Sequence, residues 1–221
     1  MDTHTQQDVW HMSGENTGRP GPLIAHRDNT NITPFALLLA ADVFKMPQPA
    51  RVYYPGCGND HSCLGYDRIH TVHADKYLTS AETEAFRLAE SEVYEKDVHK
   101  WGPPGEFDTV LFKNPTGLDL SVVMSRVCLS GIGVVVLMRV SGRAADSLLR
   151  HEQWRPAVDV VKTRSDYRIR VHDETIQLPE TGLCMETELD ESLEILARIF
   201  QRTRSDVAGY GDTPGAGGCS T

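Results

Sequence analysis

The chain has 221 residues, 40% of them hydrophobic, and a formal net charge of −9 at pH 7. This length suits one sizeable α/β domain, and the acidic balance argues against nucleic acid as a partner, because phosphate backbones are bound by dense basic surfaces. No apolar run is long enough to span a membrane, and the five cysteines, at irregular spacing, do not form a disulfide framework. Together with an N-terminus that lacks a secretory signal, these features predict a cytoplasmic protein.

Both ends of the chain differ in composition from its centre. Residues 1–30 are rich in His, Gln, Asn, Gly and Pro, which predicts a flexible N-terminal arm. The Gly/Ser/Thr/Pro content of residues 205–221 predicts a disordered tail. The domain between them is expected to cover residues 31–204. Its first element is a helix that starts at Thr33-Pro34 and ends near Met46, before two further prolines.

The next elements are predicted to alternate between strand and helix. They are, in chain order, a strand over 51–54, a short helix over 60–66, a strand over 69–74, a helix from Thr79 to about Tyr94 and a strand within 92–99. Thr79 and Glu82 have the spacing of a capping box, which marks the start of a helix.

The second half of the domain continues this alternation and then changes. Its predicted elements are a strand over 107–112, a helix over 120–129 capped by Asp119, a buried strand over 132–140, a helix over 141–151, an antiparallel pair over 158–162 and 167–177, and a last helix capped by Asp190 with Leu193, Leu196, Ile199 and Phe200 on one face. The predicted fold is α/β: a mostly parallel Rossmann-like sheet with helices on both faces and a C-terminal antiparallel hairpin.

The most informative segment is the loop that follows the first predicted strand. Gly56 and Gly58 lack a Cβ, so the backbone there can approach a nucleotide closely and direct N–H groups toward it. Asp75 ends the second predicted strand, at about the distance along the chain where nucleotide-binding folds place a carboxylate that holds ribose hydroxyls.

This order of elements, with these loop residues, resembles the class I S-adenosylmethionine-dependent methyltransferases over roughly residues 33–180. The resemblance implies S-adenosylmethionine as cofactor, with Gly56 and Gly58 under its methionine part and Cys57 as a small residue beside it. It also implies that Asp75 binds the ribose and that Asp97 lies near the adenine.

In the same family, the loop after the fourth strand faces the methyl group. That loop maps to residues 113–116, so the resemblance implies that Asn114 faces the methyl acceptor. Members that methylate amines carry Asn/Asp-Pro-Pro-aromatic there. The Asn114-Pro115-Thr116-Gly117 sequence matches only in part, which leaves a plain turn as the alternative.

The glycine motif departs from the family pattern at two positions, and we describe it as a degenerate motif. Tyr54 occupies the position of an acidic residue, and Asp60 that of the third glycine. One hypothesis is that Asp60 supplies the missing negative charge for the ammonium group of the cofactor, because a buried unpaired ammonium is costly. The alternative is that Asp60 caps the short predicted helix.

Other chemistries fit the sequence less well. Cys57, His61, Cys63, His70 and His73 lie close together in sequence, but their spacing does not match paired zinc ligands, so no metal is expected. Cys57 could act as a nucleophile at a helix start, although a small packing residue is the commoner case. A nicotinamide-binding domain would need Gly or Ala at His61.

The sequence therefore predicts a methyltransferase that acts on a small molecule or a protein. The alternative is a catalytically degenerate member of this fold that serves as a binding or scaffold subunit, because the acid of the first strand is missing.

Overall fold

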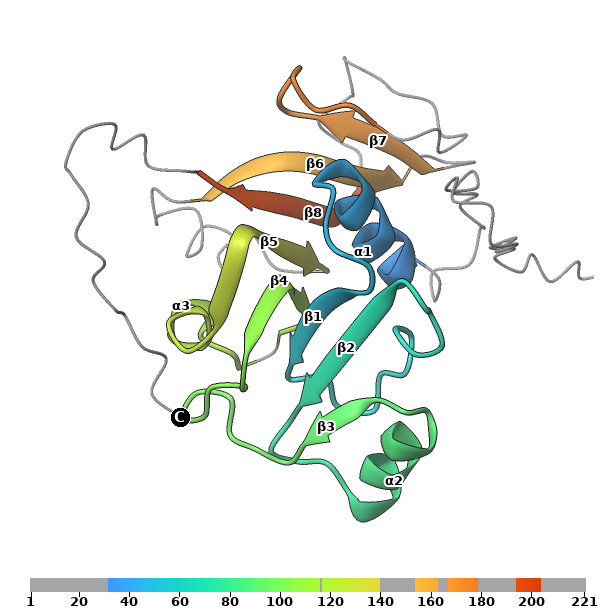
Figure 1. Cartoon of the computed structure of the whole chain (residues 1–221), viewed down its shortest axis with the longest axis vertical. Helices are drawn as coiled ribbons and strands as arrows, with labels where there is room; N and C mark the ends of the chain where they lie inside the picture. Colours follow the sequence, from blue (N-terminus) through green and yellow to red (C-terminus); the bar gives the residue numbers. More distant parts are fainter. Residues whose placement is uncertain (1–31, 116, 140–153, 163–166, 179–193, 204–221) are drawn as a thin grey trace, which may run out of the picture.

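A computed structural model of the chain describes residues 32–115, 117–139, 154–162, 167–178 and 194–203. The predicted arm, tail and helix over 141–151 lie outside these residues. The described part is an eight-stranded sheet with helices on both faces (Figure 1). Within it, every helix is too short or too polar to cross a membrane.

The sheet is parallel in one half and antiparallel in the other. In order across the sheet, its strands are β3 (Glu92–Tyr94), β2 (Ile69–Ala74), β1 (Ala50–Pro55), β4 (Glu106–Lys113), β5 (Cys128–Met138), β8 (Glu194–Arg202), β6 (Trp154–Lys162) and β7 (Tyr167–Val171). Neighbours from β3 to β5 are parallel, whereas β8 is antiparallel to both β5 and β6, and β7 is antiparallel to β6. The predicted Rossmann-like sheet with a C-terminal antiparallel element is confirmed.

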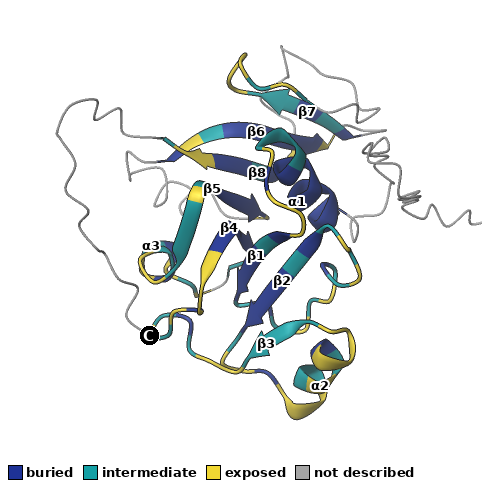
Figure 2. Ribbon diagram, viewed as in Figure 1, coloured by how far each residue is buried: buried dark blue, intermediate teal, exposed yellow. Residues whose placement is uncertain are grey.

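An apolar core lies on each face of the sheet. Val52 and Tyr54 of β1 belong to the core that contains α1 (Ile32–Val43), whereas Tyr53 belongs to the core that contains α3 (Leu120–Met124). This alternation is the two-residue period of a strand buried on both faces. Figure 2 shows that α1 and the central strands are buried, while α2 (Ser80–Leu88) is largely exposed.

Two predicted helix caps are present, and the third, Asp190, lies outside the described residues. The side chain of Thr79 accepts the N–H of Glu82 and the side chain of Glu82 accepts the N–H of Thr79, which completes the capping box of α2. Asp119 accepts two backbone N–H groups at the start of α3. Both helices end earlier than predicted, because the chain turns into β3 after α2 and into β5 after α3.

Two predicted helices are wrong. Residues 60–66 form turns, so the connection from β1 to β2 contains no helix. The last predicted helix is the strand β8, which pairs with β5 on one side and β6 on the other. Ile199 lies in the α1 core and Phe200 in the α3 core. Burial on both faces therefore produces the closely spaced apolar residues that imitate a helical stripe.

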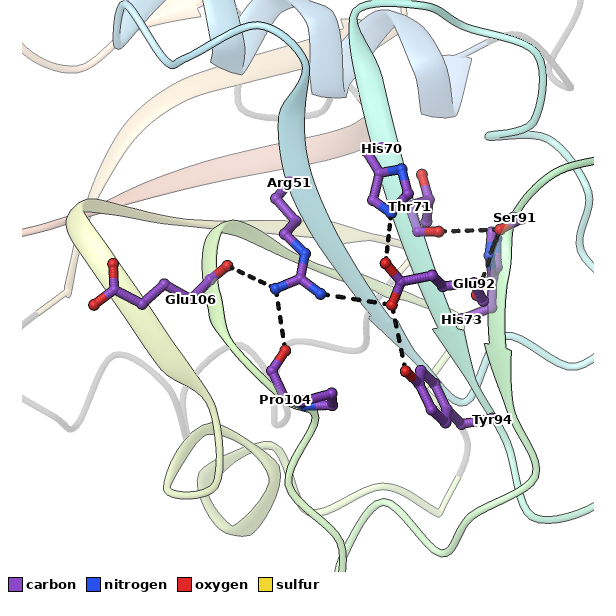
Figure 3. A network of polar contacts seen from close by, with 9 residues as sticks. All are labelled: Arg51, His70, Thr71, His73, Ser91, Glu92, Tyr94, Pro104 and Glu106. Carbon is purple, nitrogen blue, oxygen red and sulfur yellow. Dashed lines mark hydrogen bonds and ion pairs between the residues drawn. The ribbon is translucent and has the colours of Figure 1, made fainter. Parts of the chain in front are cut away.

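Arg51 joins four strands near the end of the sheet opposite the glycine loop (Figure 3). Its guanidinium donates to the carbonyls of Pro104 and Glu106 at 3.1 and 3.3 Å, and it lies 3.5 Å from a carboxylate oxygen of Glu92. It also lies over the ring of Phe107. Glu92 in turn contacts His70, so these contacts connect β1, β2, β3 and β4.

Replacing Gly105 with alanine is expected to lower the free energy of unfolding by about 1–3 kcal/mol. Gly105 has φ of +83°, and a Cβ there would lie 2.3 Å from Nη1 of Arg51. Arg51 would have to leave its two carbonyl acceptors to make room. Urea denaturation measures the change. Gly131→Ala is the control, because nothing lies within 4 Å of a Cβ at Gly131. Equal stability of the two variants would contradict this prediction.

Candidate nucleotide-binding site

A pocket with a volume of about 320 Å³ lies at the carboxyl ends of the parallel strands. We call it the Asp75 pocket. Its lining comes from the segments that follow β1, β2, β3 and β4, and comprises Gly56, Asp75, Lys76, Tyr77, Asp97, Val98, His99, Asn114, Pro115, Gly117 and Leu118. The carboxyl edge of an open α/β sheet is where such folds bind ligands. Four residues that the sequence singled out, Gly56, Asp75, Asp97 and Asn114, thus meet in one cavity.

Asp75 is held in place by the backbone on both sides of it. Its Oδ2 accepts the N–H of Gly58 at 3.1 Å, and its Oδ1 accepts the N–H of Tyr77 at 2.9 Å. A carboxylate oxygen has two lone pairs, so each oxygen keeps one for a further donor. The glycine loop and the carboxylate at the end of β2 are therefore in direct contact.

The segment after β3 supplies a second carboxylate to the pocket. The backbone N–H of His99 donates to Oδ1 of Asp97 at 3.1 Å and lowers the pKa of Asp97 below its ordinary value. Nε2 of His99 accepts the N–H of Asp119 at 3.0 Å. Because of this second bond, His99 connects the segment after β3 to the start of α3.

The segment after β4 covers part of the glycine loop. Asn114 has φ of +48° and donates its N–H to the carbonyl of Met138 at the end of β5. Leu118 packs on Gly56, and a Cβ on Gly56 would lie 2.8 Å from its Cδ1. Gly56 also has φ of +67°, so two independent constraints require glycine there.

Asp60 is engaged by other side chains of the protein. Its carboxylate accepts the hydroxyl of Tyr54 at 2.7 Å, Nζ of Lys113 at 2.7 Å and the N–H of Ser62 at 3.1 Å. Burial alone would raise the pKa of Asp60, but the bonds from Lys113 and Tyr54 outweigh it and lower the pKa below its ordinary value. The alternative of a helix cap is wrong, because no helix follows Asp60. Its role toward a cofactor ammonium stays a prediction, and Lys113 would compete with that ammonium.

The remaining candidates do not line the pocket, although Gly58 contacts Asp75. Of the described residues, Cys57, Gly58 and Asp60 lie outside the pocket lining. Cys57 is buried, and its burial raises the pKa of the thiol, which disfavours the thiolate that a nucleophile needs. In the described part of the chain, no three metal-ligating side chains converge.

Some contacts of this site have no signal in the sequence. Tyr77 could have been expected in the pocket lining, because it lies two residues after Asp75. The packing of Leu118 on Gly56 and the ion pair of Lys113 with Asp60 join residues more than 50 positions apart. A single sequence contains no pattern that pairs such residues.

No family model matches the sequence, and no curated protein matches it. Similar solved structures include a TehB-like SAM-dependent methyltransferase from Corynebacterium glutamicum (13% identity; 80% of this chain and 89% of that chain covered; TM-score 0.47). Another is a SAM-dependent O-methyltransferase from Thermotoga maritima (11% identity; 83% and 68% covered; TM-score 0.45). A third is StiE O-MT residues 961–1257 (14% identity; 56% of this chain and 54% of that chain covered; TM-score 0.41). The likeness therefore spans about half of that chain.

The strand order of the chain's own sheet defines its fold. The parallel strands lie in the order β3-β2-β1-β4-β5. The chain runs outward from β1 to β2 and β3 and then returns to the other side of β1 for β4 and β5, as in doubly wound nucleotide-binding sheets, and the antiparallel strands follow β5. The chain has a Rossmann-like α/β fold.

Proposed function

We propose that this chain binds S-adenosylmethionine in the Asp75 pocket and transfers the methyl group to a small molecule or a protein. One observation carries the proposal: Gly56, Asp75, Asp97 and Asn114, from four separate segments, line one cavity at the carboxyl edge of the sheet. Its volume of about 320 Å³ is of the order that a nucleoside ligand needs.

The pocket carries donors and acceptors that suit a nucleoside. Each oxygen of Asp75 already accepts one backbone N–H, which fixes the carboxylate and leaves one acceptor position per oxygen for two vicinal ribose hydroxyls. Asp97 is the second carboxylate of the lining and would lie near the adenine. Around Gly58, no described atom lies within 4 Å of where a Cβ would be, so the backbone is open to a ligand there.

S-adenosylmethionine would supply an activated methyl group on its sulfonium. The contribution of the chain would be alignment, because methyl transfer needs mainly a nucleophile placed in line with the reacting carbon. Asn114 is the residue that we assign to face the acceptor. The net charge of −9 favours a small molecule or a protein over a nucleic acid. The free thiols of Cys57 and Cys63 suit a reducing compartment, and we propose the cytoplasm.

A second candidate function is a binding or scaffold subunit that keeps the fold without catalysis. The observation that favours it is that protein side chains already engage the glycine loop. Leu118 packs on Gly56, and Lys113 pairs with Asp60. A chain that no longer binds a cofactor could keep such contacts without loss.

Asp75→Asn is expected to weaken the binding of S-adenosylmethionine and S-adenosylhomocysteine by about 10- to 100-fold, because charged hydrogen-bond acceptors contribute about 1.5–3 kcal/mol each. Isothermal titration calorimetry of the wild-type protein and the variant measures this. The matched control is Asp67→Asn, an exposed carboxylate outside the pocket lining, which should leave both affinities unchanged.

The same titration separates the two candidate functions. Binding of both ligands by the wild-type protein, lost in Asp75→Asn, supports the methyltransferase. A folded wild-type protein that binds neither ligand contradicts it and supports the scaffold. Binding of NAD alone would contradict both and indicate a nicotinamide-dependent oxidoreductase.

A further inference from the structure

Two side chains from the β4 side contact the segment that follows β1. Lys113, the last residue of β4, places Nζ 2.7 Å from Oδ2 of Asp60 in the segment after β1. Leu118 packs on Gly56 in the same segment. β1 and β4 are adjacent parallel strands, and the order of the sheet reverses between them. Gly56 and Leu118 also line the Asp75 pocket, so their contact forms part of the pocket wall where the sheet order predicts a ligand.

The charges on this side of the site are internally paired. Asp60 accepts hydrogen bonds from Lys113, Tyr54 and Ser62, and the side chains of Asp60 and Lys113 are only 23% and 16% exposed. A positively charged ligand group that approached Asp60 would be repelled by the ammonium of Lys113, which lies 2.7 Å from Oδ2 of Asp60. Lys113 therefore already neutralises the charge of Asp60.

The carboxylates that line the pocket lie on its other side. Asp75 follows β2 and Asp97 follows β3, and both belong to the pocket lining. Hydroxyl and amino groups of a nucleoside are the donors that such acceptors take. This side of the pocket therefore suits the adenosine half of a ligand, whereas the charge of Asp60, in the segment after β1, is already paired with Lys113.

From these contacts, and resting on the proposed binding of S-adenosylmethionine, we propose that the site recognises 5′-thioadenosines through their nucleoside half and forms no charge pair with the ammonium of the amino-acid half. Lys113 is the residue that sets this specificity, because it neutralises Asp60. A ligand without the amino-acid half should then lose little affinity.

The first test compares two ligands on the wild-type protein by calorimetry: S-adenosylhomocysteine, which carries the amino-acid half, and 5′-methylthioadenosine, which lacks it. We expect dissociation constants within about threefold of one another. Binding of S-adenosylhomocysteine more than about tenfold tighter, the effect of one charged hydrogen bond, would overturn this inference and leave the proposed function intact. Binding of neither ligand would overturn the proposed function and this inference with it.

The second test releases Asp60. Lys113→Met removes the competing ammonium, so the carboxylate becomes available to the ammonium of S-adenosylhomocysteine. We expect about a tenfold gain in affinity for that ligand and no change for 5′-methylthioadenosine. Lys113→Arg keeps the positive charge and should behave as the wild-type protein. The double variant Lys113→Met/Asp60→Asn should lose the gain. A folded Lys113→Met protein, verified by circular dichroism, whose two affinities change equally would contradict the assignment of Lys113.

Discussion

Replacing Asp159 with asparagine is expected to lower the free energy of unfolding by about 3 kcal/mol, the cost of breaking a buried charge pair by removing one partner. Asp159 on β6 is fully buried, and both of its oxygens accept bonds from the guanidinium of Arg198 on β8, at 2.7 and 3.0 Å. His172 lies 2.9 Å from one of these oxygens, and Arg170 on β7 lies 3.5 Å from it. One carboxylate therefore connects the three strands of the antiparallel half.

The pKa of Asp159 supports this role. Burial alone would raise it, yet the hydrogen bonds from His172 and Arg198 outweigh burial and hold the pKa below its ordinary value. An asparagine would present a neutral amide to basic side chains that lose their counter-charge. Urea denaturation at neutral pH measures the loss.

Asp173→Asn is the matched control, because Asp173 is exposed and its carboxylate accepts hydrogen bonds from nearby Thr175. Its change should stay within about 0.5 kcal/mol. A loss in Asp159→Asn no larger than that of the control would show that the cluster does not stabilise the sheet.

The stability of the protein is expected to fall by about 3 kcal/mol through His73 alone as the pH drops from about 7 toward 4. His73 on β2 is fully buried, and its burial lowers its pKa from 6.5 to about 4. The ring lies against Phe86, with centroids 4.4 Å apart. Ser91 donates its hydroxyl to the carbonyl of Thr71, so it accepts the Nδ1–H of His73.

The tautomer explains the direction of the effect. Because Nδ1 carries the proton, Nε2 carries a lone pair, and none of the described residues forms a hydrogen bond with it. A second proton would be placed on this buried atom without an acceptor. The folded state therefore keeps His73 neutral, while the unfolded state takes up a proton below pH 6.5. This contribution is complete above pH 6.5 and is lost as the pH falls toward 4.

His73→Asn separates this effect from the other titrating groups. The amide can still donate to Ser91 but cannot be protonated, so the variant should be less stable at neutral pH and lose less stability on acidification. His61→Gln is the control, because His61 also contacts the ring of Phe86 but is exposed, and it should keep the wild-type pH dependence. Denaturant titrations across this pH range measure both. Parallel curves for the wild-type protein and His73→Asn would contradict the prediction.

The parallel half of the fold could be predicted because its signals are local. Short runs of Val, Tyr and Phe bounded by Pro and Gly predict β1 and β4, and the capping box of Thr79 predicts the start of α2. β8 could not be predicted in this way. Its residues follow a helical spacing, and only pairing with β5 and β6, which are distant in sequence, makes the segment a strand.

The candidate site also has a part that could be predicted from the sequence and a part that could not. Gly56, Asp75, Asp97 and Asn114 could be expected to meet, because the carboxyl ends of parallel strands share one edge of the sheet. The ion pair of Lys113 with Asp60 could not, because it depends on how two connecting segments fold over that edge. The hypothesis for Asp60 considered only the charge of a ligand, whereas the chain supplies a cation of its own.

The turns over residues 60–66 have a consequence for which ligands the glycine loop favours. In dinucleotide-binding sheets, a helix begins at this loop, and its aligned peptide dipoles stabilise a pyrophosphate. Here Gly56 and Gly58 lead into turns, so a phosphorylated ligand would meet no positive helix end. A ligand whose ribose carries a neutral thioether or a cationic sulfonium in place of phosphate loses no favourable interaction at such a loop.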